Sequence, residues 1–297
     1  MRRFLARNAP GYIFLLPWFI GFFVLAVGPI ITSLYLSFTK YDIASPPQFI
    51  GLENFEYMFL WDSRFWQSLK VTFAYVALSV PGTLIFALGV AMLLDKGIRV
   101  IGIYRALFYL PSVLGGSIAV AILWRQLFSN EGVINSILAA IGIDGPYWLS
   151  DPDYSLYTLV VLAVWQFGSP MLIFLAGLRA IPQELYEAAE IDAAGRVRRF
   201  FAITLPLLAP VMFFNLVLQT IEAFKTFNSA FVISDGRGNP LDSLLFFTLY
   251  LYNEAFAYFR MGYASALAWV LLAIIAAFTA IAFATSKYWV HYENERG

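Results

Sequence analysis

Six long apolar stretches dominate the sequence, and their length limits the folds that the chain can adopt. They lie near residues 12–39, 68–94, 104–128, 156–179, 201–226 and 263–288. Each reaches the roughly 20 residues that an α-helix needs to cross the hydrocarbon core of a bilayer. The first is longer than the apolar region of a signal peptide, so we expect it to be retained. The sequence therefore predicts an all-α integral membrane protein with six transmembrane helices.

The composition excludes several classes of function. Only 13% of the residues are charged, against about 25% in soluble domains. The 19 basic and 19 acidic residues balance, and no basic cluster interleaves with aromatic residues, which argues against nucleic acid as a partner. The chain has no cysteine and one histidine, His291. We therefore predict no catalytic site and no metal site, which also disfavours an intramembrane enzyme.

The distribution of Lys and Arg predicts the orientation of the chain, because these residues are enriched in cytoplasmic loops. With the N-terminus inside, the outer segments hold seven of the 19. The inner segments hold the other twelve: Arg2, Arg3, Arg7, Lys96, Arg99, Arg105, Arg179, Arg196, Arg198, Arg199, Lys287 and Arg296. We therefore expect both termini and the loop at 180–200 to be cytoplasmic.

The segment 183–206 is unusually polar for this chain and follows Pro182, which suits a first helical turn. Acidic side chains occupy its front and basic ones its far end: Glu184, Glu187 and Glu190, then Arg196, Arg198 and Arg199. Such an arrangement complements the dipole of one short helix. Asp192 and Arg196 are four residues apart and are expected to pair on its surface. The segment is typical of a docking helix on a membrane protein.

This segment resembles the signature loop of the permease subunits of binding-protein-dependent ABC importers. Glu187-Ala188-Ala189 is followed, at the spacing of the family, by Ile203, Leu205 and Pro206. The family has a glycine where this chain has Ala193, and a glycine stands at Gly195 instead. The resemblance implies that Glu187 pairs with a basic group of an ATPase subunit, that the alanines pack into its groove, and that residues 193–195 form a turn.

The resemblance covers nearly the whole chain and points to the carbohydrate-uptake branch, which includes the maltose and glycerol-phosphate importers. The matching segments are Leu15–Trp18, Ser33–Thr39, Gly51–Phe55, Leu110-Pro111, Gly132–Asn135, Gly177-Leu178 and Met261–Ala266. It implies a type I ABC importer (MetI-like) permease fold with a cytoplasmic coupling helix, in a bacterial or archaeal cytoplasmic membrane. We expect an N-terminal segment at 1–66, a five-helix core at 67–290 that carries the coupling helix at 183–200, and a cytoplasmic tail at 291–297.

The resemblance also implies the partners and the docking residues. The expected partners are a second permease subunit, two ATPase subunits, an extracytoplasmic sugar-binding protein, the lipid bilayer and a sugar. The chain contains no phosphate-binding Gly-x-x-x-x-Gly-Lys-Ser/Thr loop, so ATP and Mg are expected on the ATPase subunits and no cofactor on this chain. The docking residues are Glu187, Ala188, Ala189, Asp192, Ala193, Gly195, Ile203, Leu205 and Pro206.

Polar residues inside the predicted helices are candidates for a substrate path, since sugars bind through hydrogen-bonding side chains in an otherwise apolar cavity. Gln219, Glu222 and Thr226 share one helical face. Gln166 and Ser169 lie beside a break expected at Gly168 and Pro170. The other candidates, Ser112 and Gly116, follow Pro111. All of these but Glu222 also fall where the larger maltose permease subunit lines its sugar site. The same residues could instead join helices to one another.

The sequence leaves open one alternative function and two interpretations of one residue pair. A secondary, ion-coupled transporter of a small polar solute would need acidic or histidine residues buried in the membrane. Glu222 is the clear intramembrane candidate, and it has Lys225 three residues later on the same face. These two residues form either a local ion pair near the outer interface or a polar wall of a substrate path.

Overall fold

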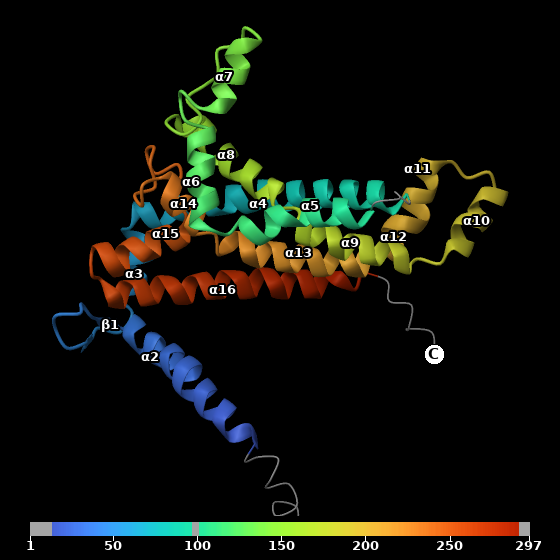
Figure 1. The fold of residues 1–297 in the computed structure, drawn as a ribbon. Helices are drawn as coiled ribbons and strands as arrows, with labels where there is room; N and C mark the ends of the chain where they lie inside the picture. Colours follow the sequence, from blue (N-terminus) through green and yellow to red (C-terminus); the bar gives the residue numbers. More distant parts are fainter. Residues whose placement is uncertain (1–13, 97–100, 291–297) are drawn as a thin grey trace, which may run out of the picture. The chain divides into compact units, whose positions relative to one another are not determined.

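A computed structural model describes residues 14–96 and 101–290 (Figure 1). Several predictions concern positions outside these ranges: the start of the first span, Arg2, Arg3, Arg7, Arg99, His291, Arg296 and the tail at 291–297. The described residues are mostly helical. They divide into two compact units, with chain divisions after residues 62, 250 and 272: the first unit holds the described residues up to 62 and residues 251–272, and the second holds the remaining described residues.

Three unbroken helices are long and apolar enough to cross a bilayer: Phe14–Ser37, Ser63–Asp95 and Met261–Ser286. Three helix pairs reach it together but are bent at a short break. These are Ile101–Leu114 with Ile118–Leu127, bent by 99°, Pro152–Trp165 with Gly168–Ala180, by 43°, and Arg196–Leu207 with Ala209–Ile233, by 66°. When each pair is counted as one span, the described residues contain the six spans that the sequence predicts.

The first unit contains the N-terminal span and the segment that follows it. The span, Phe14–Ser37, includes the π-helical turn η1 (Phe23–Val27) and α2 (Gly28–Ser37). It is followed by the antiparallel pair β1 (Thr39–Lys40) and β2 (Gln48–Phe49), by α3 (Glu53–Leu60), and later by η3 (Asn253–Ala257). The side-chain amide of Asn54 donates to the carbonyls of Ser37 and Thr39, both at 2.9 Å. Asn54 of the Gly-Leu-Glu-Asn-Phe segment thus connects the start of α3 to the end of the span.

The same unit contains a buried polar cluster. The Arg260 guanidinium binds the Glu254 carboxylate, whose side chain is 3% exposed, and lies 5.1 Å from the ring of Tyr263. Tyr263 in turn donates its hydroxyl proton to Asp62. A buried carboxylate is costly unless it is paired in this way.

The second unit is built around α4 (Ser63–Asp95), which packs against α8, α9 and α13. Its other helices are α5 (Ile101–Leu114), α6 (Ile118–Leu127), α7 (Val133–Ala140), α8 (Pro152–Trp165), α9 (Gly168–Ala180), α10 (Gln183–Ile191), α11 (Arg196–Arg199), η2 (Phe200–Thr204), α12 (Leu205–Leu207), α13 (Ala209–Phe224) and α14 (Asn228–Ile233). The chain continues through α15 (Phe247–Tyr252) and α16 (Met261–Ser286), which contribute to both units. Within this unit, α10 and α11 lie at the opposite end from α6, α7 and α14 (Figure 1).

Small residues let the helices of this unit approach closely. Ala87 and Ala91 of α4 are fully buried against Met171 and Phe174 of α9. A Cβ atom at Gly168 would lie 2.3 Å from the carbonyl oxygen of Phe108, so α5 and α9 touch through their backbones here. Tight packing through small residues is typical of membrane helices, which gain no hydrophobic free energy by associating in lipid.

The breaks occur where backbone hydrogen bonds are missing and other groups replace them. The fourth span breaks at Gln166 and Phe167, and not at Gly168 and Pro170 as predicted. Gly168 begins α9, and Pro170 lies in its first turn, where a missing N–H does no harm. In the third span, Ser117 caps α6 by accepting from the Val120 N–H at 3.3 Å.

Candidate functional site

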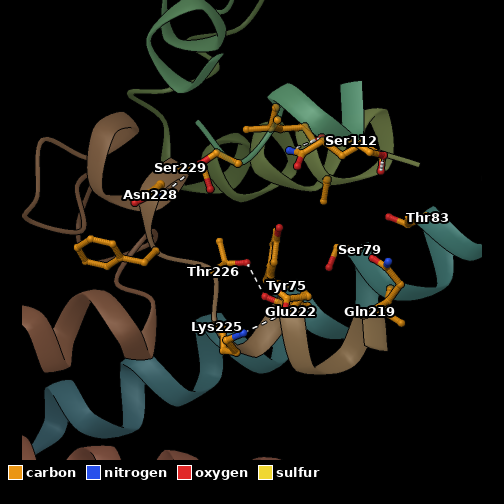
Figure 2. A pocket seen from close by; sticks show the side chains of 18 of the residues that line it. Tyr75, Ser79, Thr83, Ser112, Gln219, Glu222, Lys225, Thr226, Asn228 and Ser229 are labelled. Carbon is orange, nitrogen blue, oxygen red and sulfur yellow. Dashed lines mark hydrogen bonds and ion pairs between the residues drawn. The ribbon is translucent and has the colours of Figure 1, made fainter. Parts of the chain in front are cut away.

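A cavity of about 400 Å³ lies among the breaks of the second unit (Figure 2). Its volume falls within the range of small-molecule sites. It is lined by Tyr75, Ser79, Val80, Thr83, Ser112, Gly115, Gly116, Leu162, Ala163, Gln166, Ser169, Gln219, Glu222, Ala223, Lys225, Thr226, Phe227, Asn228 and Ser229. The seven candidates for a substrate path are all among these residues. They come from three spans, and the tertiary structure gathers them around one space that α4 also lines.

Ser112 holds two of the broken spans together. Its hydroxyl donates to the carbonyl of Gln166 at 2.7 Å and accepts the N–H of Ser169 at 2.9 Å. Pro170 has no N–H to bond the Gln166 carbonyl in the ordinary helical pattern, so the serine supplies the missing donor. Because the hydroxyl has a single proton, Ser112 can only accept from a solute. Its first role is therefore to position the wall of the cavity.

Gln166 lies over the break in the third span. A Cβ atom at Gly115 would come within 2.2 Å of the Gln166 side chain, so only glycine leaves room for it. The Gln166 amide nitrogen donates to the carbonyl of Leu162 at 3.3 Å. On the other side of the break, Asn228 donates to the carbonyl of Gly116 at 3.0 Å. These contacts keep the gap between α5 and α6 open to the cavity.

The two charged residues of the cavity form an ion pair. Lys225 Nζ lies 2.9 Å from Glu222 Oε1, and both side chains are more than half exposed. The sequence allowed either a local ion pair or a polar wall of a substrate path. The structure makes the two interpretations compatible, since a local pair forms and both of its members line the cavity. Exposed pairs of this kind contribute little to stability, so their charges remain accessible to a solute.

Three lining residues of α4 were missed in the sequence. Tyr75, Ser79 and Thr83 follow each other at intervals of four residues and are each at most 5% exposed. This spacing places them on one helical face, a signal that was available in the second apolar stretch. The Ser79 hydroxyl faces the cavity (Figure 2) and has no hydrogen-bond partner among the described residues. A buried hydroxyl without a partner is costly, unless a bound molecule or water satisfies it.

The polar loop forms two helices and not the single helix predicted over 183–200. α10 ends at Ile191, and Arg196 begins α11, so the three arginines do not lie at the C-terminus of α10. The Ala194 N–H bonds the carbonyl of Ala189 at 2.9 Å, and Ala193 N–H that of Glu190 at 3.0 Å. This pair of bonds is the Schellman motif, which stops a helix with a left-handed residue. That residue is Ala193, with φ of +53°, and the turn expected at 193–195 is present.

The ion pair predicted in this loop is also wrong. Within the described part of the loop, Glu190 pairs with Arg199, and no pair joins Asp192 to Arg196. The predicted spacing of four residues required a continuous helix, and the turn after Asp192 removes it. The other docking candidates lie along the loop: Glu187, Ala188, Asp192, Ala193 and Gly195 are exposed, whereas Ala189, Ile203, Leu205 and Pro206 are half-buried.

Replacing Ala193 with glycine is expected to stabilise α10. A non-glycine residue in the left-handed region costs about 1 kcal/mol, and glycine removes this cost at the helix end. Slower hydrogen exchange of the α10 amides, by about five-fold, would report the gain. Gly195→Ala is the matched control, because Gly195 has an ordinary φ of −65° and no atom within 4 Å of its Cβ position. The role of Ala193 would be contradicted if exchange became slower in the control, or if it did not become slower in the Ala193 variant.

No group of three or more His, Cys, Asp or Glu side chains that could hold a metal ion occurs in the part of the chain that the structure describes. The groups that the cavity presents to a solute are therefore hydroxyl and amide side chains, two aromatic rings and one ion pair.

Comparisons with known proteins agree with the motifs in the loop. The family described as "Binding-protein-dependent transport system inner membrane component" matches residues 61–290. A probable ABC transporter permease of Bacillus subtilis (strain 168), YesP, is 56% identical over 289 residues, which cover 97% of this chain and 94% of that protein. The sulfoquinovosyl glycerol permease SmoG of Agrobacterium fabrum (strain C58 / ATCC 33970) is 34% identical, covering 87% of this chain and 84% of SmoG.

The fold also matches a solved structure. The crystal structure of a bacterial alginate ABC transporter, in complex with an alginate pentasaccharide-bound periplasmic protein, contains a chain with a TM-score of 0.82 and 22% identity. The match covers 97% of both chains. The resemblance inferred from the signature loop is thereby confirmed, as is the MetI-like permease fold. The chain belongs to the family of inner-membrane permease components of binding-protein-dependent ABC transport systems.

Proposed function

We propose that this chain is the transmembrane permease subunit of an importer that moves a sugar across the cytoplasmic membrane by ATP-driven alternating access. The observation that carries the proposal is the cavity, in which hydroxyl and amide side chains from four spans surround a volume suited to a small solute. An extracytoplasmic binding protein delivers the sugar, which is a mono-, di- or oligosaccharide.

The chemistry of the cavity supports a hydroxyl-rich solute. Sugars present both donors and acceptors. The Gln219 amide can supply both, whereas Thr226, whose hydroxyl donates to the Glu222 carbonyl at 3.4 Å, can accept. The Ser79 hydroxyl, which makes no hydrogen bond of ordinary geometry with the described residues, can form one with a solute or water in this space. The rings of Tyr75 and Phe227 add apolar surface of the kind that packs against sugar rings. Relatives named as permeases for lactose and for arabinooligosaccharides are 32% and 31% identical, which supports the same class of solute.

The energy is proposed to come from two separate ATPase subunits, which bind ATP and Mg and dock on α10 through Glu187, Ala188 and Ala189. A second permease subunit completes the pathway. Both termini and the α10–α11 loop face the cytoplasm. The separation of this loop from α6, α7 and α14 within the second unit supports such an orientation, because the two ends then meet opposite membrane surfaces (Figure 1). In this proposal, residues 1–66 form the N-terminal tail, the first transmembrane helix and an outer loop, residues 67–290 form the five-helix core, and residues 291–297 form a cytoplasmic tail.

The proposal is tested by purifying the chain in lipid with its neighbouring permease, ATPase and binding protein, and by measuring sugar-stimulated ATP hydrolysis. We expect Glu187→Ala to lose this stimulation by about ten-fold, the effect of removing one important contact at an interface. Glu184→Ala is the matched control, since Glu184 is also exposed and acidic on α10. Equal loss in both variants would contradict a specific docking role. A wild-type chain that recruits no ATPase would favour the ion-coupled transporter.

A further inference from the structure

Two side-chain contacts join α10 to the segment that follows it. The Tyr186 hydroxyl lies 2.9 Å from the Thr204 hydroxyl in η2, and Glu190 pairs with Arg199 at the end of α11. The two contacts connect positions that converge toward the turn at 192–195, as in an antiparallel helical hairpin. The hairpin is thus bonded near its open end and again halfway to the turn.

The two contacts differ in their surroundings. Thr204 is 6% exposed and Tyr186 is half-buried, whereas in the ion pair the Glu190 side chain is 65% exposed and the Arg199 side chain 20%. An exposed ion pair is screened by water and salt and contributes little. A hydrogen bond shielded from water keeps most of its strength, and its loss leaves a polar group without a partner. The Tyr186–Thr204 bond is therefore the stronger of the two links.

Thr204 occupies a place where the helix geometry changes. η2 (Phe200–Thr204) is a π-helical turn, closed by the bond from the Leu205 N–H to the Phe200 carbonyl. Pro206 follows, and the chain then bends by 66° at Leu208 to enter α13, whose last turn lines the cavity. Such π turns occur often at functional sites, because they are locally less stable than an α-helix. Without a second attachment, this turn would allow α10 to move independently of the fifth span.

We propose that the Tyr186–Thr204 hydrogen bond makes α10 and the start of the fifth span move as one body, so that displacement of α10 reaches α13 and the cavity. This inference rests on the proposed function, since the displacement comes from ATPase subunits docked on α10. Tyr186 and Thr204 are positioning residues in this scheme. Their effect is on how much sugar moves per ATP hydrolysed, not on ATP hydrolysis or on sugar binding.

The test uses Tyr186→Phe and Thr204→Val, which remove one hydroxyl each and keep the shape of the side chain. In the reconstituted complex, we expect each variant to lower the sugar transported per ATP by about five-fold, the effect of one hydrogen bond. The double variant should be no worse than either single variant, because all three lack the same bond. Effects that add, or an unchanged ratio, would overturn the proposal. Thr285→Val is the matched control, because among the described residues the Thr285 hydroxyl bonds only carbonyls of its own helix.

A second measurement separates this proposal from the proposed function. Hydrogen exchange of the α10 amides in the purified chain needs no ATPase, and we expect it to be about five-fold faster in Thr204→Val than in the wild type. Equal exchange in the two proteins would overturn the link, whatever the transport result. Absence of sugar-stimulated ATP hydrolysis in the wild-type complex would instead overturn the proposed function.

Discussion

Gly168→Ala is expected to lower the thermal unfolding midpoint of the purified chain by roughly 5 °C, the shift that a loss of about 2 kcal/mol gives in a large domain. The added Cβ atom would lie 2.3 Å from the Phe108 carbonyl oxygen and 2.7 Å from the Tyr109 Cα atom. Both are backbone atoms, which cannot rotate away as the end of a side chain can. α5 and α9 must therefore separate, and overpacking of this kind typically costs 1–3 kcal/mol.

The same substitution should also impair transport, because α5 and α9 carry Ser112 and Ser169, the two sides of the broken wall of the cavity. Gly89→Ala is the matched control, since Gly89 lies within α4 with no atom within 4 Å of its Cβ position. Alanine in a helix interior is favoured over glycine by about 1 kcal/mol, so the midpoint should not fall in this variant. An unchanged midpoint for Gly168→Ala would show that the two helices do not touch through their backbones.

Ser79→Leu should reduce sugar uptake by more than about ten-fold, because the larger side chain enters the cavity and occupies space that the solute needs. Ser79 is 2% exposed and points into the cavity (Figure 2), so a leucine has little room elsewhere. Uptake of labelled sugar into vesicles that contain the complete complex, at several sugar concentrations, measures the effect. Uptake at the wild-type level would place the solute path outside this cavity.

Ser79→Ala separates the loss of space from the loss of a hydroxyl. The Ser79 hydroxyl has no partner among the described residues, so its removal should leave the unfolding stability unchanged, whereas it should raise the sugar concentration for half-maximal uptake several-fold. Ser68→Ala, on the same helix, is the opposite case. Its buried hydroxyl donates to the Phe65 carbonyl at 2.8 Å and lies outside the cavity, so stability should fall and uptake should keep its concentration dependence. An unstable Ser79→Ala variant would indicate a structural role instead.

The features that depend on one short segment of the chain could be predicted from the sequence. The length of an apolar stretch decides by itself whether a helix can cross a bilayer, so the six spans could be predicted. The spacing of Glu187, Ala188, Ala189, Ile203 and Pro206 is likewise a property of a short segment. The polar residues of the third, fourth and fifth spans could be named for the same reason, because few polar residues occur in such stretches.

Local patterns were less informative about where helices stop. The charges at 184–199 suggested one helix, but the Schellman motif ends α10 at Ile191 and places Ala193 at positive φ. The position at which the family has glycine thus adopts a left-handed backbone conformation in this chain, although it holds alanine. Gly195 does not replace it, since φ of −65° is open to any residue.

The sequence by itself determined the number of spans, the helical class, the family and those polar cavity residues that lie on the third, fourth and fifth spans. Only the tertiary structure decided what those residues do. Ser112 meets Gln166 and Ser169 across more than 50 residues of chain, and this contact turns a predicted solute ligand into a support for the cavity wall. Ser79 lies on a predicted span for which the sequence named no candidate residue. Its hydroxyl faces the cavity and has no hydrogen-bond partner among the described residues. The physical reason is that hydrophobic length and helical spacing are properties of one segment, whereas the partner of a hydroxyl depends on which segments pack together.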